Sequence, residues 1–112
     1  MEVVYDSIIE LWLAETWDLT LDWDEANTEK LGKHATTVDQ VESLFDSNFI
    51  LGGKIIPPAT TAWNEDRFII FGQTRDGTRL TIVWTIRENK IRPISCRRMR
   101  SNESKNYQKR IT

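Results

Sequence analysis

Apolar residues in the first half of the chain recur at intervals of three and four, which predicts helices. Helix starts are marked by capping boxes, in which an oxygen-bearing side chain precedes Glu or Gln by three positions. The candidate pairs are Ser7 with Glu10, Asp22 with Glu25, and Thr37 with Gln40. We therefore expect helices over residues 5–17, from Asp22 towards Lys33, and over residues 38–46, with a short strand over the alternating residues 19–23.

The second half of the chain has the alternation and the turn residues of a sheet. Between residues 48 and 66, paired glycines and paired prolines interrupt short apolar runs, which favours strand, turn and loop over helix. Residues 67–74 and 79–86 flank Arg-Asp-Gly-Thr, a sequence typical of a tight hairpin. Residues 90–97 predict a third strand, which Pro93 makes an edge strand or a bulged one. A short helix is expected near the end of the chain.

Together these elements predict an α+β fold, in which a small antiparallel sheet packs with two to four helices. The sheet is expected to be a three-strand meander with one or two short strands added. A chain of 112 residues, 39% hydrophobic and 29% charged, is expected to form a single globular domain over residues 1–112. Its apolar runs fall short of the roughly 20 residues that span a membrane, and its acidic start does not resemble a secretory signal. We expect a cytoplasmic protein without membrane contact.

The chain contains one cysteine, Cys96, and one histidine, His34. A single cysteine excludes an internal disulfide. A tetrahedral zinc site would need carboxylates for its remaining ligands, and none is suitably spaced. We therefore expect neither a metal nor a cofactor.

Charge is distributed unevenly along the chain, although the net charge is only −2. Residues 1–50 hold two basic and twelve acidic residues, a net charge of −10. Residues 51–112 hold thirteen basic and five acidic residues, a net charge of +8. Such asymmetry indicates a cationic surface for phosphates or for an acidic partner, and the acidic half could face solvent or a basic chain. The alternative is that the two halves neutralise each other across the fold.

Three short stretches carry the candidate chemistry, and each also has an ordinary structural explanation. Lys33 and His34 follow the second predicted helix, where cations complement the helix dipole. Glu65 and Arg67 lie two apart at the start of a strand, so they either pair or serve phosphoryl transfer together. Three arginines, Arg97, Arg98 and Arg100, suit phosphate and base binding or are solvated charge at a strand end.

The chain also contains five tryptophans, and Ser95 and Cys96 place two nucleophilic side chains next to each other. Trp84 shares its strand face with apolar residues and is expected in the core, whereas Trp63 precedes the Glu65–Arg67 stretch and could stack on a base. Ser95 and Cys96 have no base nearby in sequence, and Cys96 is expected to be buried, so acyl-transfer chemistry is not favoured.

Taken in order, these motifs resemble the BrnT family of bacterial toxins, which is related in fold to RelE-type ribonucleases. The resemblance rests on Trp-Asp-Glu-Ala-Asn, Lys-His, Glu-Asp-Arg-Phe, Asp-Gly-Thr-Arg-Leu, Ile-Arg-Pro-Ile-Ser-Cys-Arg-Arg-Met, and the final Glu103 with Tyr107, and it covers roughly residues 20–110. It implies a compact RelE-like α+β fold, metal-independent ribonuclease activity, and neutralisation by a BrnA-type antitoxin with a ribbon-helix-helix DNA-binding domain. Residues 1–18 lie outside it, as a helical extension.

Position by position, the family motifs fall on a few residues of this chain. The Lys-His motif falls on Lys33 and His34, the Glu-x-Arg-Phe motif on Glu65, Arg67 and Phe68, and the Ser-Ala-Arg motif on Ser95, Cys96 and Arg97. The chain departs from the family pattern at Ala35 in place of glycine, at Pro93 in place of a β-branched residue, and at Arg100 in place of threonine. Ser101 or Asn102 is expected to cap the last helix instead.

For this ribonuclease reading, Arg67 and Arg97 are expected to stabilise the charge of the transition state. His34 or Glu65 would serve as general base or acid, and Lys33 and Tyr107 would contact phosphate or donate a proton. Arg67, Arg97 and His34 should then converge in one pocket wide enough for a phosphodiester. Arg97→Ala should abolish growth inhibition with a nearly unchanged melting temperature.

Two other functions remain open from the sequence. In one, the fold is an inactive binding module that holds a DNA-binding partner and co-represses transcription. In the other, weaker one, the chain binds double-stranded DNA directly, although no helix-turn-helix pattern is present. If the chain is a toxin, we expect it to contact DNA only through the antitoxin. A hetero-tetramer of toxin and antitoxin is one assembly that the sequence leaves open.

Overall fold

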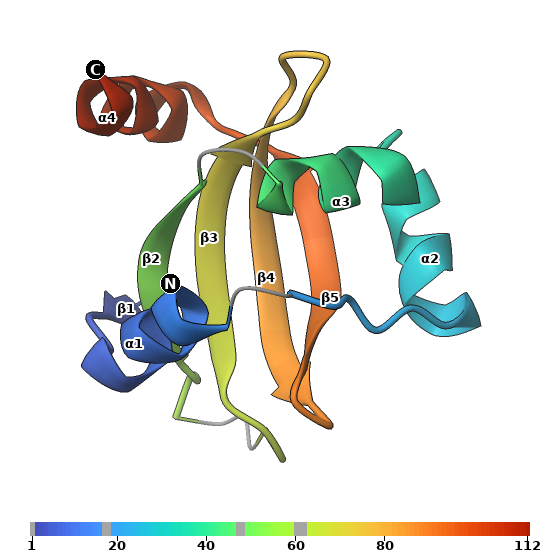
Figure 1. Ribbon diagram of the computed structural model, residues 1–112, viewed down its shortest axis with the longest axis vertical. Helices are drawn as coiled ribbons and strands as arrows, with labels where there is room; N and C mark the ends of the chain where they lie inside the picture. Colours follow the sequence, from blue (N-terminus) through green and yellow to red (C-terminus); the bar gives the residue numbers. More distant parts are fainter. Residues whose placement is uncertain (1, 17–18, 47–48, 60–62) are drawn as a thin grey trace.

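The computed structural model describes residues 2–16, 19–46, 49–59 and 63–112. They form an α+β fold built on a five-stranded antiparallel sheet of order β1-β2-β3-β4-β5 (Figure 1). The strands are β1 (Glu2–Val4), β2 (Phe49–Ile56), β3 (Arg67–Gln73), β4 (Arg79–Arg87) and β5 (Lys90–Arg98). The helices are α1 (Ser7–Glu15), α2 (Glu25–Gly32), α3 (Val38–Phe45) and α4 (Ser101–Ile111).

The predicted helices are present, but two of them begin at other caps. Asp6, not Ser7, caps α1, because its carboxylate accepts the N–H groups of the two residues after Ser7. Asp24, not Asp22, caps α2 and exchanges hydrogen bonds with Asn27. In both cases the aspartate directly before the first helical residue supplies the acceptor, so Ser7 becomes the first residue of α1 and Asp22 lies outside α2. For α3, the predicted Thr37–Gln40 capping box is confirmed.

The strands differ from prediction at the start of the chain. Residues 19–23 do not form a regular strand, since Leu21 makes only an isolated parallel bridge to Ile91. The first strand is β1, which pairs with β2. β1 lies within residues 1–18, which were expected to be a helical extension. Short polar-flanked segments such as β1 gain their hydrogen bonds from a distant partner, which local alternation does not reveal.

The predicted Arg-Asp-Gly-Thr hairpin and the antiparallel third strand of the meander are confirmed. The Asp-Gly pair turns between β3 and β4, with Gly77 at a φ of 89°. Glu88 and Asn89, at φ values of 53° and 63°, turn between β4 and β5. Pro93 was expected on an edge or bulged strand, and β5 is both: it is the last strand of the sheet, and its register shifts beside Trp84.

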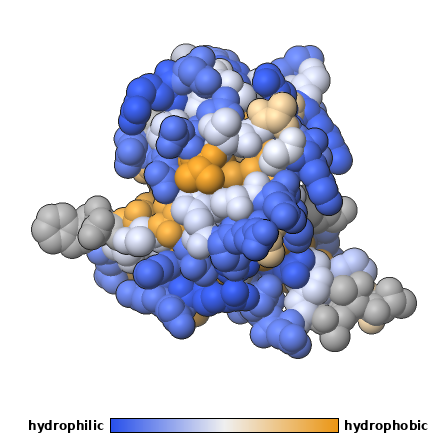
Figure 2. All heavy atoms as spheres, turned by 90° about the vertical axis from the view of Figure 1, so that its right-hand side faces the viewer, coloured by the Kyte–Doolittle hydropathy of each residue, from blue (hydrophilic) through white to orange (hydrophobic). Residues whose placement is uncertain are grey.

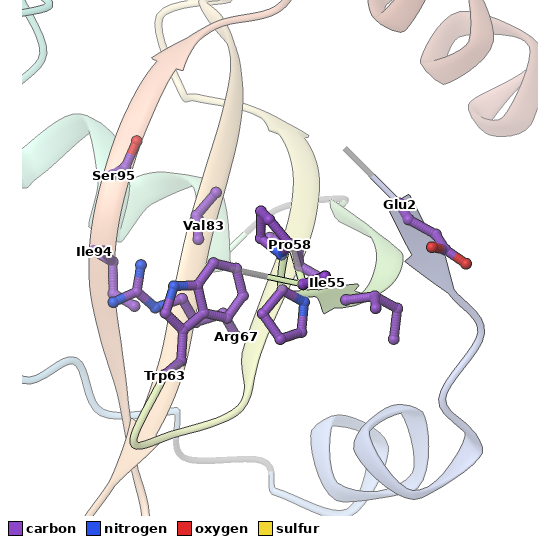
Figure 3. A pocket seen from close by; sticks show the side chains of 11 residues that line it. Glu2, Ile55, Pro58, Trp63, Arg67, Val83, Ile94 and Ser95 are labelled. Atoms are coloured by element: carbon purple, nitrogen blue, oxygen red, sulfur yellow. The ribbon is translucent and has the colours of Figure 1, made fainter. Parts of the chain in front are cut away.

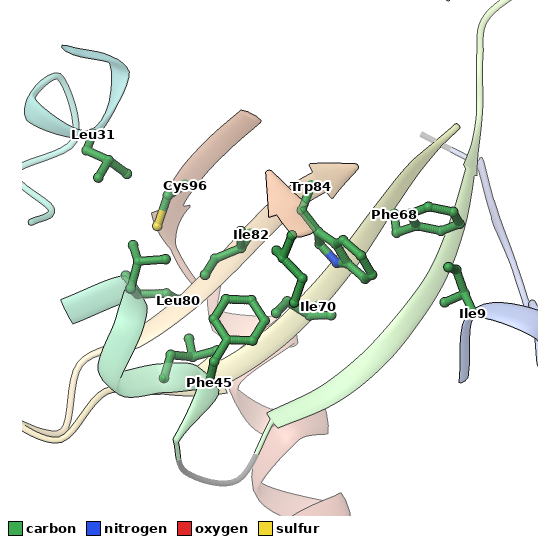
Figure 4. Packing of buried hydrophobic residues seen from close by; sticks show 12 residues of the cluster. Ile9, Leu31, Phe45, Phe68, Ile70, Leu80, Ile82, Trp84 and Cys96 are labelled. Atoms are coloured by element: carbon green, nitrogen blue, oxygen red, sulfur yellow. The ribbon is translucent and has the colours of Figure 1, made fainter. Parts of the chain in front are cut away.

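One face of the sheet packs against the first three helices and forms the core (Figure 4). The buried apolar residues of this cluster are Ile9, Leu31, Val41, Leu44, Phe45, Phe68, Ile70, Leu80, Ile82, Trp84, Ile91 and Cys96. Trp84 is fully buried and Cys96 nearly so, as the sequence predicted. Trp17 lies outside the described residues.

The opposite face of the sheet, which we call the outer face, carries the alternate side chains of the same strands. Helix α4 covers the end of this face beside the β3–β4 turn (Figure 1). There Arg79 donates to Ser104, and Tyr107 is buried beneath the Arg79 guanidinium. The rest of the outer face, towards the start of β3, is not covered by a described helix, and it holds a cavity of about 740 Å³.

Two kinds of feature are absent from the described residues. No helix there is long and apolar enough to cross a membrane. No group of three or more His, Cys, Asp or Glu side chains there is placed to hold a metal ion.

Candidate functional site

Arg67 is the first residue of β3 and points to the outer face, because its neighbour Phe68 points into the core. Its guanidinium carbon lies 4.5 Å from the centre of the Trp63 ring. Its Nη2 lies 3.6 Å from Oε1 of Glu65, so the ion pair considered from the sequence is present. The Nε of Arg67 is buried without a hydrogen-bond partner among the described residues. The Arg67 side chain is 30% exposed, so part of its guanidinium faces solvent on the outer face.

A cavity of about 740 Å³ opens beside Arg67 on the outer face (Figure 3). Its walls are mostly apolar, and we call it the apolar pocket. The lining residues are Glu2, Ile55, Ile56, Pro57, Pro58, Ala59, Trp63, Arg67, Val83, Ile94 and Ser95. In Figure 3, the Trp63 indole and Arg67 lie at the same end as Ile94, and Glu2 lies at the opposite end. The pocket thus combines flat apolar walls with one cation.

A second, smaller cavity of about 180 Å³ lies on the other side of Arg67. We call it the cationic pocket, because four of its lining residues are basic and only one is acidic. Its lining residues are Ala26, Asn27, Lys30, Glu65, Arg67, Arg87, Arg92, Pro93 and Ile94. Lys30, Arg87 and Arg92 are not among the binding residues that the sequence predicts. The sequence feature that could have identified Arg87 and Arg92 was the predicted antiparallel pairing of their two strands, which brings residues 87 and 92 close together.

The cationic pocket draws on α2, which lies along the open edge of β5 (Figure 1). The Asn27 side chain ties this helix to the strand by donating to the carbonyl oxygen of Pro93. Figure 2 looks onto this side of the molecule, where most atoms belong to hydrophilic residues and hydrophobic residues show near the middle. The side of the molecule that carries the cationic pocket is therefore mostly polar.

Arg97, the second expected arginine, also points to the outer face, since its neighbour Cys96 is in the core. Its Nη1 and Nη2 donate to the two carboxylate oxygens of Glu103, at 2.7 and 2.9 Å. These bonds, with the backbone N–H of Arg100 and the Thr81 hydroxyl, lower the pKa of Glu103 to about 2. Glu103 is therefore a carboxylate at neutral pH and holds Arg97 in place. Arg97 has five N–H donors, and its bonds to Glu103 and to the Arg98 carbonyl use three.

Arg67 and Arg97 share the outer face but do not meet. Arg97 is in register with Thr81 of β4, which is in register with Phe71 of β3. Phe71 lies four residues beyond Arg67, so the two arginines are separated by about 13 Å along the strands and about 10 Å across them. Ser95 lies between them on β5 and lines the apolar pocket.

His34 and Lys33 lie in the turn after α2 and are exposed. His34 makes no side-chain hydrogen bond or ion pair with any residue that the structure describes. Neither His34 nor Arg97 lines the two cavities beside Arg67. The expected convergence of Arg67, Arg97 and His34 in one pocket is therefore not seen. Ala35, which replaces the glycine of the family pattern, has a φ of 53°, a left-handed conformation that favours glycine.

The remaining candidates lie around α4 and the end of β5. Arg98 and Arg100 are exposed, whereas Tyr107 is buried under Arg79, and burial raises the pKa of its hydroxyl. The cap expected at Ser101 or Asn102 is wrong: the N-cap position is Arg100. The Glu103 side chain accepts the Arg100 N–H and so replaces the missing cap.

Both interpretations of the charge asymmetry are represented in the ion pairs of the described residues. Arg92 pairs with Asp22 and Asp24, and Arg75 with Asp46, so these two arginines neutralise the acidic half. Arg67 and Arg97 pair instead with glutamates of their own half of the chain.

Comparison with known proteins gives the family. Comparison with curated proteins produced no match. A family model matches residues 23–103, and it is described as the ribonuclease toxin, BrnT, of type II toxin-antitoxin systems. The match covers most of the chain and includes the Lys-His turn, both cavities except the wall at Glu2, and the Arg97–Glu103 pair. The chain therefore belongs to the BrnT family of type II toxin-antitoxin ribonuclease toxins.

Proposed function

We propose that this chain is a metal-independent ribonuclease that arrests growth by cleaving RNA at the outer face of its sheet. The observation that carries the proposal is the position of Arg67, between an apolar pocket and a cationic pocket and beside Glu65. Arginine binds phosphate oxygens, and the apolar walls suit the base or ribose on one side of that phosphate.

Without a metal, RNA is cleaved when the ribose 2′-hydroxyl attacks the adjacent phosphate. The step needs a proton acceptor for the 2′-hydroxyl, a proton donor for the leaving 5′-oxygen, and cations around the phosphorane-like transition state. We assign the charge stabilisation to Arg67 and the proton acceptor to Glu65, whose carboxylate lies 3.6 Å from the guanidinium. The leaving 5′-oxygen takes its proton from solvent water. Glu65 is favoured over His34, which lines neither cavity.

Arg97 is assigned to a neighbouring phosphate of the same RNA strand. It lies on the same face as Arg67, and two of its five donors are unused by the described contacts. Glu103 fixes its orientation, so little side-chain entropy is lost when it binds. The exposed Lys33, Arg98 and Arg100 would add non-specific attraction for the strand, and the buried Tyr107 would support the helix that holds Arg97.

The partner in this proposal is a BrnA-type antitoxin with a ribbon-helix-helix domain, which neutralises the toxin in the cytoplasm. DNA is contacted through that antitoxin and not by this chain. The acidic helices α1 to α3 offer a surface for a basic segment of the antitoxin. A hetero-tetramer of two toxins and two antitoxins is the assembly we propose.

Induction of the chain alone in a bacterial host tests the activity directly. We expect growth to stop and RNA to be degraded, and Arg67→Ala to abolish both. Arg75→Ala is the matched control, because the Arg75 side chain is 81% exposed and far from the cavities, and it should remain toxic. An Arg67→Ala protein as toxic as the unmodified chain would refute the assignment.

The second candidate is an inactive binding module that co-represses transcription with a DNA-binding partner. The pairing of Arg97 with Glu103 favours it, because the pair neutralises a charge that the nuclease would use. The same induction separates the two functions. A chain that neither slows growth nor degrades RNA, yet co-purifies with its antitoxin, would support the module.

A further inference from the structure

The apolar pocket is built partly from a segment outside the family match. The family model begins at residue 23, whereas Glu2 of β1 forms one end of the pocket. β1 reaches this position by pairing with β2, whose Ile55 lies opposite Val3 and lines the pocket floor. The N-terminal segment therefore adds a wall to the site as well as a strand to the sheet.

The shape and chemistry of the pocket restrict what it can hold. A volume of about 740 Å³ is within the range of small-molecule sites, which is roughly 300–1,000 Å³. Its apolar lining from Ile55, Val83 and Ile94 favours a flat apolar body over a charged or strongly hydrated one. Trp63 is half-buried and lines the pocket, so its indole offers an aromatic ring for stacking.

Arg67 adds the requirement for an anion at one end. Its guanidinium lies against the Trp63 ring, and its buried Nε has no acceptor among the described residues. The Arg67 side chain is 30% exposed, so its terminal guanidinium N–H groups can donate to a ligand oxygen. The occupant should therefore have a planar apolar body joined to a phosphate, which is the composition of a nucleotide.

We propose that the apolar pocket is a base-binding subsite, which holds the nucleobase next to the phosphate that Arg67 contacts. This inference rests on the proposed ribonuclease function and specifies where the substrate is read. The base lies between Trp63 on one side and Val83 and Ile94 on the other, and the N-terminal β1 closes the far end. The subsite thus couples phosphate binding at Arg67 to recognition of an unstacked base.

The test is nuclear magnetic resonance of the full chain with labelled isoleucine methyls, titrated with the four ribonucleoside 3′-monophosphates. A base in the pocket should shift the methyl signals of Ile55 and Ile94 upfield through its ring current. Inorganic phosphate and ribose 5-phosphate should perturb the Arg67 Nε–H signal and leave these methyls in place. Nucleotides that perturb Arg67 but not the two methyls would overturn the subsite, as would nucleotides that fail to bind.

Val83→Phe supplies the second measurement, because its ring fills the pocket from β4. We expect nucleotide binding to weaken at least tenfold and phosphate binding to stay within twofold. Ile8→Phe is the matched control for an added ring, because Ile8 is 79% exposed and lines neither the apolar nor the cationic pocket, and it should bind nucleotides within threefold of the unmodified chain. Equal nucleotide affinity in a folded Val83→Phe protein would overturn the proposal.

An RNA-cleavage assay keeps the two proposals separable. Cleavage by the unmodified chain without methyl shifts on nucleotide binding would refute the subsite alone. Methyl shifts and a Val83→Phe defect without any cleavage would refute the ribonuclease function and leave a nucleotide-binding site.

Discussion

Arg97 and Glu103 face each other through two parallel hydrogen bonds, 2.7 Å from Nη1 to Oε1 and 2.9 Å from Nη2 to Oε2. The pair joins the end of β5 to the first turn of α4. The same carboxylate accepts the Arg100 N–H at 2.8 Å and the Thr81 hydroxyl at 3.2 Å. One side chain thus orients Arg97, starts α4 and fixes this helix to the sheet.

Arg97→Ala is expected to abolish growth inhibition and also to destabilise the fold. The sequence alone suggested a nearly unchanged melting temperature, but the substitution leaves the Glu103 carboxylate, which is only 15% exposed, without its charged partner. A loss of about 1–3 kcal/mol in the free energy of unfolding is expected. Urea unfolding measures it, with the exposed neighbour Arg98→Ala as a control that should change by less than about 0.5 kcal/mol. An Arg97→Ala protein as stable as the unmodified chain would contradict the pairing.

The same pair makes stability depend on acid pH. The pKa of Glu103 is about 2 in the folded protein and 4.5 ordinarily. Because the folded value is the lower one, its contribution is full above about pH 4.5 and is lost as the pH falls towards 2. The contribution is on the order of 2 kcal/mol.

Urea unfolding between pH 2 and pH 7 tests this dependence. Asp76, whose pKa is also lowered to about 2, contributes in the same direction, so the informative quantity is the difference between the unmodified chain and Glu103→Gln. That difference should shrink as the pH falls from 4.5 to 2. A difference that is constant with pH would show that Glu103 titrates normally in the folded protein.

The sequence correctly predicted the elements that are marked by turn or capping residues close to them in the chain. The two hairpins follow from their turn residues, and α3 follows from the Thr37–Gln40 capping box. β1 escaped prediction because its three residues gain their hydrogen bonds from β2, about fifty residues away in sequence. The caps of α1 and α2 were misplaced because two nearby oxygen-bearing residues competed in each case, and only backbone geometry decides between them.

For the candidate site, the sequence identified Arg67, its partner Glu65 and Arg97, but not the pairing of Arg97 with Glu103. Arg67 with Glu65 was within reach of strand alternation, because the two are two residues apart. The pairing of Arg92 with Asp24 joins residues 68 positions apart, and the apolar pocket joins Glu2 to Ser95. Such contacts depend on the order of strands in the sheet, which single-sequence periodicity does not specify.

Arg92→Met is expected to loosen the attachment of α2 to the sheet. Arg92 is 12% exposed, and its Nη2 lies 2.7 Å from Asp24, the N-cap of α2, while its Nη1 lies 3.3 Å from Asp22. Methionine keeps the apolar stem but leaves two carboxylates close together, so unfolding should require about 2–3 kcal/mol less. Lys90→Met, at an exposed position of the same strand, is the control for added hydrophobicity. Equal losses in the two variants would argue against a role for the ion pairs.

Gly72→Ala tests how closely α3 approaches the sheet. A Cβ at Gly72 would lie 2.6–2.9 Å from the side-chain carbons of Leu44, which is fully buried and cannot move aside. A loss of about 1–3 kcal/mol in the free energy of unfolding is expected. At Gly32 a Cβ meets nothing within 4 Å, so Gly32→Ala should not destabilise the fold. Thermal melts of both variants measure the contrast, and a stable Gly72→Ala protein would contradict the packing of Leu44 against β3.

Glu65→Gln and His34→Gln distinguish the two candidates for the general base. Glu65 lies beside Arg67 in the cationic pocket, whereas His34 is exposed in the turn after α2 and lines neither cavity. Glu65→Gln removes the proton acceptor and should lower kcat for RNA cleavage by about 10²–10⁴ with little change in KM. His34→Gln should keep kcat within about threefold and leave the acid limb of the pH–rate profile in place, because the imidazole of His34 takes no part in the proposed proton transfer. A profile whose acid limb disappears in His34→Gln would assign the proton transfer to the histidine and require the RNA to bind across the edge of β5, between α2 and the outer face.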